Sequence, residues 1–372
     1  MALHLGLLAA DRAFSERSRE RSQTMADPPA ERQYRSRERS QQGMVPGVVT
    51  ILDVARAAGV SKSTVSRVLD ERLPHSRSAT AERVRKAAAE LGYVRDPLAS
   101  GLRRAGTSTI GVIVPRLTDT VMAMLYEEIT AVAAARELFT VVATTEDSVE
   151  TEAVAVRSLQ MRRVDGLILT TARMGTPVTT GQTPCALALR TDGTSPAAIG
   201  DDRLGARLAT RHLIDFGHRR IGLVGGPGYA SSAQGRADGY RDALTDAGIP
   251  VDPALITGNA FSIEAGEVAG RQLLDRDDRP TAVFAVNDNT AIGVLSAAHR
   301  LGLSVPRDVS IVGYNDIPVV SRLPVPLTTV RVPFRQIATD ALHLLTEHKG
   351  HTTTLTTTPT LIPRGSTGPP AE

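Results

Sequence analysis

The sequence predicts a small all-α domain followed by an α/β core of two doubly wound subdomains, each with a parallel sheet. Short helical patterns fill residues 48–95, and continuous apolar runs alternate with longer amphipathic segments from residue 107 onward. Unbroken apolar strands separated by helices are typical of a parallel sheet that is covered on both faces. There are too many such runs for one small sheet, so we expect two subdomains.

Charge is distributed unevenly along the 372 residues. Residues 45–105 hold 11 Lys and Arg against 6 Asp and Glu, whereas the chain after residue 105 holds 24 basic and 28 acidic residues. A basic segment before an acidic bulk predicts a polyanion partner near the N-terminus, with a solvated charged face as the alternative. Cys185 is the only cysteine, which excludes an internal disulfide and a multi-cysteine metal site.

Within the first 47 residues, residues 11–44 lack hydrophobic periodicity and are rich in Arg, Ser, Glu and Gln. We expect a disordered tail here, because such a segment cannot bury enough apolar surface to order itself. The alternative is a start site placed too early, with Met44 as the natural first residue. The short apolar run at 3–10 has no preceding basic region, and no run approaches the roughly 20 residues of a membrane span, so we expect neither a signal peptide nor a membrane segment.

Residues 48–95 contain the pattern of three short helices. Thr50 followed by Asp53 is a capping pair that opens the first helix. Gly59 supplies a tight turn after it. A third helix is predicted from Thr80 to Leu91.

The middle helix has the composition of a helix that reads DNA. Val65 and Val68 pack inward, which leaves a polar face for a DNA groove, where Arg and Lys can donate to guanine acceptors or to phosphates. An ordinary helical hairpin with a charged face is the alternative. We predict contacts that read sequence from Lys62, Ser63 and Arg67, and contacts to phosphate from Thr50, Ser61 and Thr64.

The segment VTILDVARAAGVSKSTVSRVLD, residues 49–70, resembles the DNA-binding signature of the lactose-repressor/galactose-repressor (LacI/GalR) family. The resemblance continues through RVRKAAAELGYVRDPLASGLRRAGTSTIGVIVP and reaches LIPRGST, so it spans about Val48 to Thr367. Leu52 departs from it, since the family usually has Tyr there. The resemblance implies a helix-turn-helix DNA-binding domain at 48–95 and a periplasmic-binding-protein-like core, in which the ligand sits between two subdomains.

The resemblance also implies a hinge at residues 96–106, where DPLASGL occupies the family's hinge position. In the family a short helix forms there on DNA, and a Leu from each chain wedges into the minor groove. Leu102 matches that Leu, and Ala99 matches its neighbour. A plain linker is the alternative.

Effector-binding residues are implied by motifs of the core. Arg236 in SSAQGRADGY matches the family's ligand-gripping Arg, and Ser232 precedes it by one helical turn. Asn287 and Asn315 follow apolar strands, at the end where parallel sheets present ligand residues, although each could simply cap a helix. The predicted effector contacts are Arg190, Ser232, Arg236, Asn287 and Asn315.

The pocket departs from the family pattern at two places. Val121 and Met122 stand where two aromatic residues are common, and Arg190 stands where Asp is common. The pocket is therefore expected to be less aromatic and more positive. This leaves an acidic or phosphorylated ligand open beside a sugar or related metabolite.

The core is predicted to span residues 107–368. Its expected N-subdomain comprises 107–200 and 333–352, and its expected C-subdomain comprises 201–332 and 353–368. The apolar runs behind this division are 109–114, 139–144, 166–170, 185–189, 221–225, 282–286 and 309–312. The helical patterns between them are 121–136, 150–163, 203–216, 236–247, 263–274 and 290–301.

These features predict a sequence-specific DNA-binding transcriptional regulator, and specifically a repressor, whose affinity for a palindromic operator is controlled by a small molecule in the core cleft. One recognition helix reads only a few base pairs, so we expect a homodimer assembled through the core, with higher oligomers left open. We expect a cytoplasmic, nucleoid-associated protein. Effector identity, operator sequence and the sign of the response are not determined by the sequence.

The sequence disfavours two other classes of protein. An enzyme is disfavoured because the glycine cluster GLVGGPGYASS meets neither the GxGxxG nor the GxxxxGK[ST] spacing, and the histidines lack metal-site partners. We expect no catalysis, cofactor or metal. A transporter's solute-binding protein would need export and would carry no helix-turn-helix.

Overall fold

The computed structural model describes residues 49–70, 74, 76–93, 107–347 and 353–371. Its internal contacts divide the chain into two compact units, residues 1–96 and 97–372, and each is described by itself. The predicted tail at 1–47 lies outside the described residues, and so does all of the predicted hinge at 96–106.

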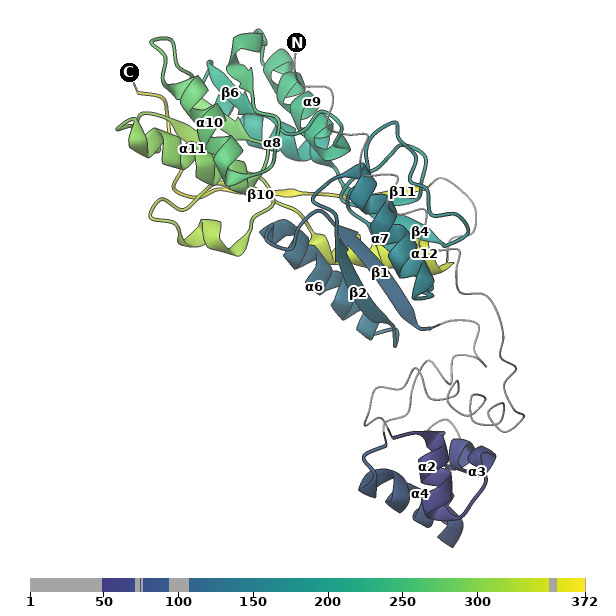
Figure 1. The fold of residues 1–372 in the computed structure, drawn as a ribbon. Coiled ribbons are helices and arrows are strands. Elements are labelled where there is room, and N and C mark those ends of the chain that lie inside the picture. The colour runs from purple at the N-terminus through teal and green to yellow at the C-terminus, as the bar shows by residue number, and fades with distance from the viewer. Residues whose placement is uncertain (1–48, 71–73, 75, 94–106, 348–352, 372) are drawn as a thin grey trace, which may run out of the picture. The chain divides into compact units, whose positions relative to one another are not determined.

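The N-terminal unit contains three helices among its described residues (Figure 1): α2 (Ile51–Ala58), α3 (Lys62–Val68) and α4 (Ala79–Glu90). They enclose a core centred on the fully buried Val54, Val65 and Val84. The expected cap of the first helix is confirmed, because the Thr50 backbone N–H and hydroxyl donate to Asp53 at 2.9 and 2.6 Å. Gly59 ends that helix with a φ of 66°.

The first subdomain of the core is built on a six-stranded parallel sheet of order β11-β5-β4-β3-β1-β2. Alternate side chains of its strands point to opposite faces. Val112 and Ile168 pack toward one face, and Ile113 and Leu167 toward the other. The strands are β1 (Thr109–Val114), β2 (Phe139–Thr144), β3 (Gly166–Leu169), β4 (Cys185–Ala188), β5 (Ala197–Gly200) and β11 (Thr354–Thr357).

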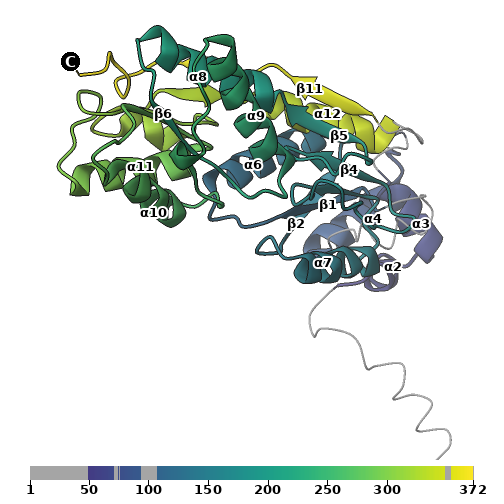
Figure 2. The same ribbon diagram turned by 90° about the horizontal axis from the view of Figure 1, so that it is seen from above.

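Helices cover both faces of this sheet, as the apolar runs predicted (Figure 2). The helix α7 (Val149–Met161) packs on the face of Ile113. The helices α6 (Thr120–Ala134) and α12 (Phe334–Glu347) pack on the face of Val112.

The second subdomain has a four-stranded parallel sheet of order β7-β6-β8-β9. Its strands are β6 (Ile221–Val224), β7 (Ile256–Thr257), β8 (Ala282–Ala285) and β9 (Ser310–Val312). Its helices are α8 (Asp202–Asp215), α9 (Ser231–Asp246), α10 (Ile263–Leu274) and α11 (Asp288–Arg300), with short 3₁₀ turns η1 (Pro253–Leu255) and η2 (Pro318–Arg322). The prediction of two parallel-sheet subdomains is confirmed.

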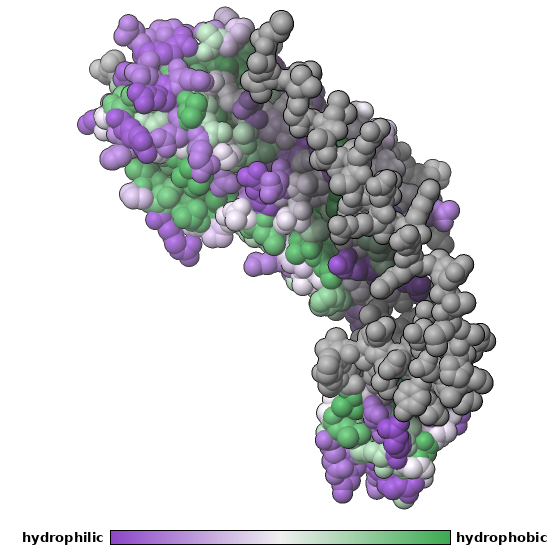
Figure 3. Space-filling view, in the orientation of Figure 1, coloured by the Kyte–Doolittle hydropathy of each residue, from purple (hydrophilic) through white to green (hydrophobic). Residues whose placement is uncertain are grey.

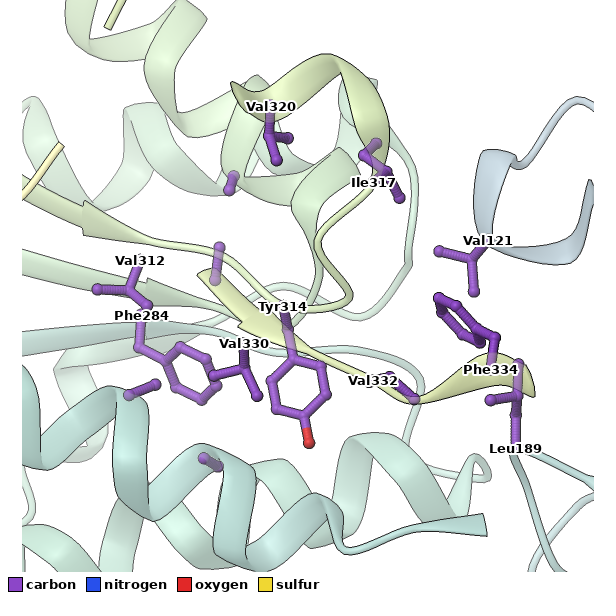
Figure 4. Close-up of a cluster of buried hydrophobic side chains, with 14 of the residues drawn as sticks. Val121, Leu189, Phe284, Val312, Tyr314, Ile317, Val320, Val330, Val332 and Phe334 are labelled. Atoms are coloured by element: carbon purple, nitrogen blue, oxygen red, sulfur yellow. The ribbon is translucent and has the colours of Figure 1, made fainter. Parts of the chain in front are cut away.

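The chain crosses between the subdomains three times. It passes from β5 into α8, from β10 (Thr329–Arg331) into α12, and from β11 into β12 (Thr360–Ile362), which pairs antiparallel with β10. Figure 4 shows the second crossing, which runs from Val330, near Phe284 and Tyr314, to Phe334 beside Val121 and Leu189.

One predicted boundary is wrong at the third crossing. The sequence predicts that residues 353–368 belong to the C-subdomain, but β11 pairs with β5 of the first sheet, in the register Thr354↔Ala197. The segment TTTLTTT is nearly all threonine and carries no apolar run. Its place at the edge of the first sheet is set by backbone pairing, which sequence pattern does not reveal.

Other elements also differ from the prediction. The helix α9 begins at Ser231, five residues before the predicted start at Arg236, because Ser, Ala and Gln extend the helix without adding apolar periodicity. The helix α12 and the short strands β5, β7, β10, β11 and β12 were not predicted. Among the described residues, no helix is both long enough and apolar enough to span a membrane.

Candidate functional site

The helix α3 presents the polar face that its sequence predicts. Lys62, Ser63 and Arg67 are exposed, whereas Val65 is fully buried against α2 and α4. Ser61 caps the helix by accepting from the Thr64 backbone N–H at 3.2 Å. An exposed row of cationic and hydroxyl groups on a short helix held by a buried valine is suited to a DNA groove.

Three of the predicted DNA contacts differ from these exposed residues of α3. The Thr50 hydroxyl already donates to Asp53, so it is not available as a phosphate donor while this cap is formed. Ala99 and Leu102 lie outside the described residues.

All five predicted effector residues line one cavity between the two subdomains of the core. Residues of the first subdomain follow β1 and β4, and residues of the second follow β6, β7, β8 and β9. The side chains at the carboxyl ends of these strands therefore meet, as expected for parallel sheets. The lining consists of Asp119, Val121, Met122, Leu189, Arg190, Ser232, Arg236, Phe261, Asn287 and Asn315.

The buried guanidinium group of Arg190 is held by a carboxylate. Its Nη1 lies 3.1 and 3.2 Å from the two carboxylate oxygens of Asp147, and its Cζ lies 5.3 Å from the ring centre of Phe261. A buried charge needs such a partner to offset its desolvation. The pair also neutralises the positive charge that the sequence led us to expect in the pocket.

Arg236 is held in a similar way in the second subdomain. Its Nε donates to Asp202 at 2.8 Å, its Nη1 donates to the Val286 carbonyl at 2.7 Å, and its Cζ lies 3.8 Å from the ring centre of Tyr314. Within the described part of the chain, Nη2 of Arg236 makes no hydrogen bond, so this nitrogen is available to a bound molecule.

The two asparagines reach the cavity by different means. Asn287 caps α11, where its side-chain oxygen accepts from the Thr290 backbone N–H at 2.8 Å and its Nδ2 donates to the Phe261 carbonyl at 3.0 Å. Asn287 is thus both a helix cap and a pocket residue. The backbone of Asn315 has a φ of 108°, which few residues other than glycine adopt. The chain turns at this residue, just after β9, and Asn315 lines the cavity.

Asp119 and Phe261 are pocket residues that sequence reasoning missed. Asp119 caps α6 by accepting from the Val121 N–H at 3.1 Å, and the same oxygen accepts from Asn289 of the other subdomain at 3.3 Å. Burial raises the pKa of Asp119 above its ordinary value. Its place just after β1 was a usable signal, whereas the loop that carries Phe261 has no pattern that marks it.

The cavity offers donors on both walls, a carboxylate and an apolar side, which suits a small polar ligand with some hydrocarbon surface. Within the described ranges, no three His, Cys, Asp or Glu side chains are grouped so that they could hold a metal ion.

A helix-turn-helix unit, joined to a two-subdomain core with a cavity between the subdomains, defines the class of DNA-binding regulators with a sensor core. Residues 50–96 match the model of bacterial regulatory proteins of the lacI family, and residues 210–367 match a periplasmic binding protein-like domain. Across 331 residues the chain is 35% identical to the ribose operon repressor of Escherichia coli strain K12, covering 86% of this chain and all of that protein. The chain belongs to the lacI family, and it is a DNA-binding transcriptional regulator.

Other relatives and solved structures agree with this placement. The repressor CytR of the same Escherichia coli strain is 34% identical over 302 residues, which cover 80% of this chain and 88% of CytR. The lac repressor dimer bound to operator and the anti-inducer ONPF has a TM-score of 0.76 at 29% identity, covering 86% of this chain and 99% of that one. A complex of the regulator CelR with cellobiose has a TM-score of 0.65 at 29% identity, with the same coverage.

Proposed function

We propose that this protein is a repressor that binds a palindromic operator as a homodimer. Its affinity for the operator falls or rises when a small carbohydrate or related metabolite fills the core cavity. The observation that carries the proposal is the cavity itself, because Arg190, Ser232, Arg236, Asn287 and Asn315 converge there from both subdomains. A ligand held by both walls favours one arrangement of the subdomains, and only such differential binding can shift a conformational equilibrium.

Charge pairing supports a neutral ligand over an anionic one. Asp147 and Asp202 each hold one of the two buried arginines, and Asp119 adds a third carboxylate at the cavity. An added phosphate or carboxylate would have to compete with these groups for the arginines. One relative is named for the ribose operon, and CelR is solved in complex with cellobiose. Both sugars are neutral.

Exposed apolar side chains on the core support assembly into a dimer. On the first subdomain, Phe139 is 68% exposed and Met161 is 78% exposed, and on the second, Val268 and Val319 are 61% and 48% exposed. Figure 3 shows apolar surface over the lobe that carries α10, α11 and η2. A continuous apolar patch on a protein surface is typical of sites of protein association.

The DNA contacts, the location and the absence of catalysis are proposed because the chain belongs to the lacI family. The DNA contacts are Lys62, Ser63 and Arg67 to bases, Ser61 and Thr64 to phosphates, and Ala99 and Leu102 of the 96–106 hinge to the minor groove. Thr50 joins the phosphate contacts only when its hydroxyl is released from Asp53. The protein acts in the cytoplasm at the nucleoid, carries no cofactor and catalyses no reaction.

A selection of random duplex DNA with the full-length protein, followed by a sugar screen on the selected site, tests the proposal. We expect a palindromic site, and we expect ribose, cellobiose or a related sugar to change its affinity at least tenfold, which corresponds to about 1.4 kcal/mol. Enrichment of no sequence, or an affinity unchanged by every neutral sugar but altered by sugar phosphates, would contradict it.

A further inference from the structure

One tyrosine of the second subdomain makes several contacts across the cleft. The Tyr229 hydroxyl donates to Asp147 of the first subdomain at 2.8 Å, and its carbonyl accepts from the Met174 N–H at 2.9 Å. Arg173 stacks on its ring, with Cζ 3.8 Å from the ring centre. None of these four residues lines the cavity itself, so they form a separate set of contacts at its side.

Asp147 is shared between the two subdomains. Its carboxylate accepts from Arg190 of the pocket and from Tyr229 of the opposite subdomain, and its carbonyl oxygen accepts from Arg173. Its φ of 60° follows a φ of 51° at Glu146, and two successive non-glycine residues in this region cost free energy unless surrounding contacts hold them. Local backbone bonds, such as that from the Glu146 N–H to the Pro115 carbonyl, and the contacts of Asp147 to Arg173, Arg190 and Tyr229 together hold this turn.

A second hydrogen bond across the cleft lies beside the first. The backbone N–H of Thr191, directly after Arg190, donates to the hydroxyl of Ser231 at 2.9 Å. Ser231 in turn directly precedes Ser232 of the pocket. Both walls of the cavity are therefore joined, next to their ligand-facing residues, by bonds that exist only when the subdomains are together.

We propose that Asp147, Tyr229 and Ser231 form a latch that holds the subdomains closed, and that Asp147 is a positioning residue that couples the orientation of Arg190 to this closure. Opening the cleft removes the Tyr229 hydroxyl from the carboxylate, which leaves Arg190 as its only side-chain partner in the described structure. A ligand that contacts Arg190 in the closed arrangement then also favours the latch. The inference rests on the proposed effector site, but the latch can be observed without any ligand.

Hydrogen exchange of the full-length protein, without ligand or DNA, tests the latch at two amides. The N–H groups of Met174 and Thr191 are protected by acceptors on the other subdomain, so their exchange reports opening. Tyr229→Phe removes only the hydroxyl that bonds Asp147. We expect it to raise exchange at both amides about tenfold or more, as loss of a hydrogen bond to a charged acceptor should. Ser231→Ala should raise exchange at Thr191 in particular.

The matched control is Tyr126→Phe, which removes a half-buried hydroxyl that lies 3.5 Å from the Thr140 carbonyl within the first subdomain. It should leave exchange at Met174 and Thr191 unchanged. Exchange in Tyr229→Phe equal to that of the wild type, or an equal rise in both variants, would overturn the latch. Operator binding of the wild type is measured separately, so a failure of DNA binding would count against the proposed function and not against this inference.

Discussion

Individual side chains of the cavity have structural contacts besides the role that we propose for them. Arg236 bonds Asp202 and the Val286 carbonyl, and it stacks on Tyr314. Arg236→Ala would leave Asp202 without its cation, and breaking a buried ion pair costs about 3–5 kcal/mol. The substitution should therefore destabilise the core as well as lower the affinity for the ligand. Smaller changes are cleaner probes of the site.

Ser232→Ala is such a change, because the Ser232 hydroxyl lines the cavity and makes no hydrogen bond within the described residues. We expect the effector to bind about threefold to tenfold more weakly, which is roughly the free energy of one neutral hydrogen bond. Operator binding by the ligand-free protein should be unchanged. Fluorescence anisotropy of labelled operator, titrated with the sugar found in the screen, measures both. The control Ser321→Ala removes an exposed hydroxyl of η2, and an equal loss there would refute a pocket role for Ser232.

Arg67→Ala tests the reading of sequence by α3. Arg67 is exposed on the last turn of that helix, opposite the buried Val65. We expect a loss of about 1–3 kcal/mol on the selected site and relaxed preference at one base pair. Arg83→Ala removes the same charge from an exposed position on α4. If Arg67→Ala weakens random DNA as much as the selected site, Arg67 contacts only phosphate.

Asp288 gives the stability of the core a dependence on pH. It is fully buried, accepts from Thr329 at 2.6 Å and from the Ile317 N–H at 2.8 Å, and burial raises its pKa from 3.8 to about 7. The folded state therefore holds the proton more tightly than the unfolded state. The stabilisation is complete below about pH 3.8 and is lost as the pH rises through about 7.

Asp288→Asn should remove this dependence. Between about pH 4 and pH 7 the free energy of unfolding of the wild type should fall relative to the variant, by up to about 1.4 kcal/mol per pH unit. Urea titrations of both proteins at several pH values measure the difference. A difference that is independent of pH would show that Asp288 keeps one protonation state in the folded and unfolded chains.

At the scale of elements, close helix packing in the second subdomain depends on glycine. A Cβ added at Gly239 of α9 would lie 2.1 Å from the Arg203 carbonyl of α8. This approach also lets α8 present Asp202 to Arg236. The pairing of helices is therefore linked to the geometry of the pocket.

Gly239→Ala should force α8 and α9 apart. We expect a loss of about 1–3 kcal/mol or more in the free energy of unfolding, as for overpacked cores, measured by urea denaturation. Gly365→Ala is the control, because an added Cβ there meets its nearest atom at 3.6 Å, an ordinary contact. Comparable stability of the two variants would mean that the helices can move apart at little cost.

At the scale of the whole molecule, the palindromic operator that we propose calls for two chains. We expect the full-length protein to sediment as a dimer at about micromolar concentration. Because we propose that the chains assemble through the core, Val319→Asp should weaken the dimer, whereas Leu91→Asp, at an exposed leucine of the N-terminal unit, should leave it intact. A monomeric wild type, or dissociation by Leu91→Asp alone, would place the assembly elsewhere or exclude it.

Local patterns were sufficient for most of the fold. Continuous apolar runs located β1, β2, β3, β4, β6, β8 and β9, because a strand covered on both faces must be apolar on both. The cap at Thr50 and the turn at Gly59 depend only on neighbouring residues, so they were also predictable. The positions of the strand ends, together with the family motifs, predicted five residues that line the cavity.

Only the tertiary structure decided which partners these residues have. The charge of Arg190 is offset by Asp147, 43 positions earlier in the chain, and the latch pairs Asp147 with Tyr229, 82 positions later. The strand β11 joins the first sheet through backbone bonds that leave no periodic mark in a run of threonines. Sequence determines the elements through interactions among near neighbours, whereas the charge of the pocket, the crossing of the strands and the contacts across the cleft arise from segments that meet only when the chain is folded.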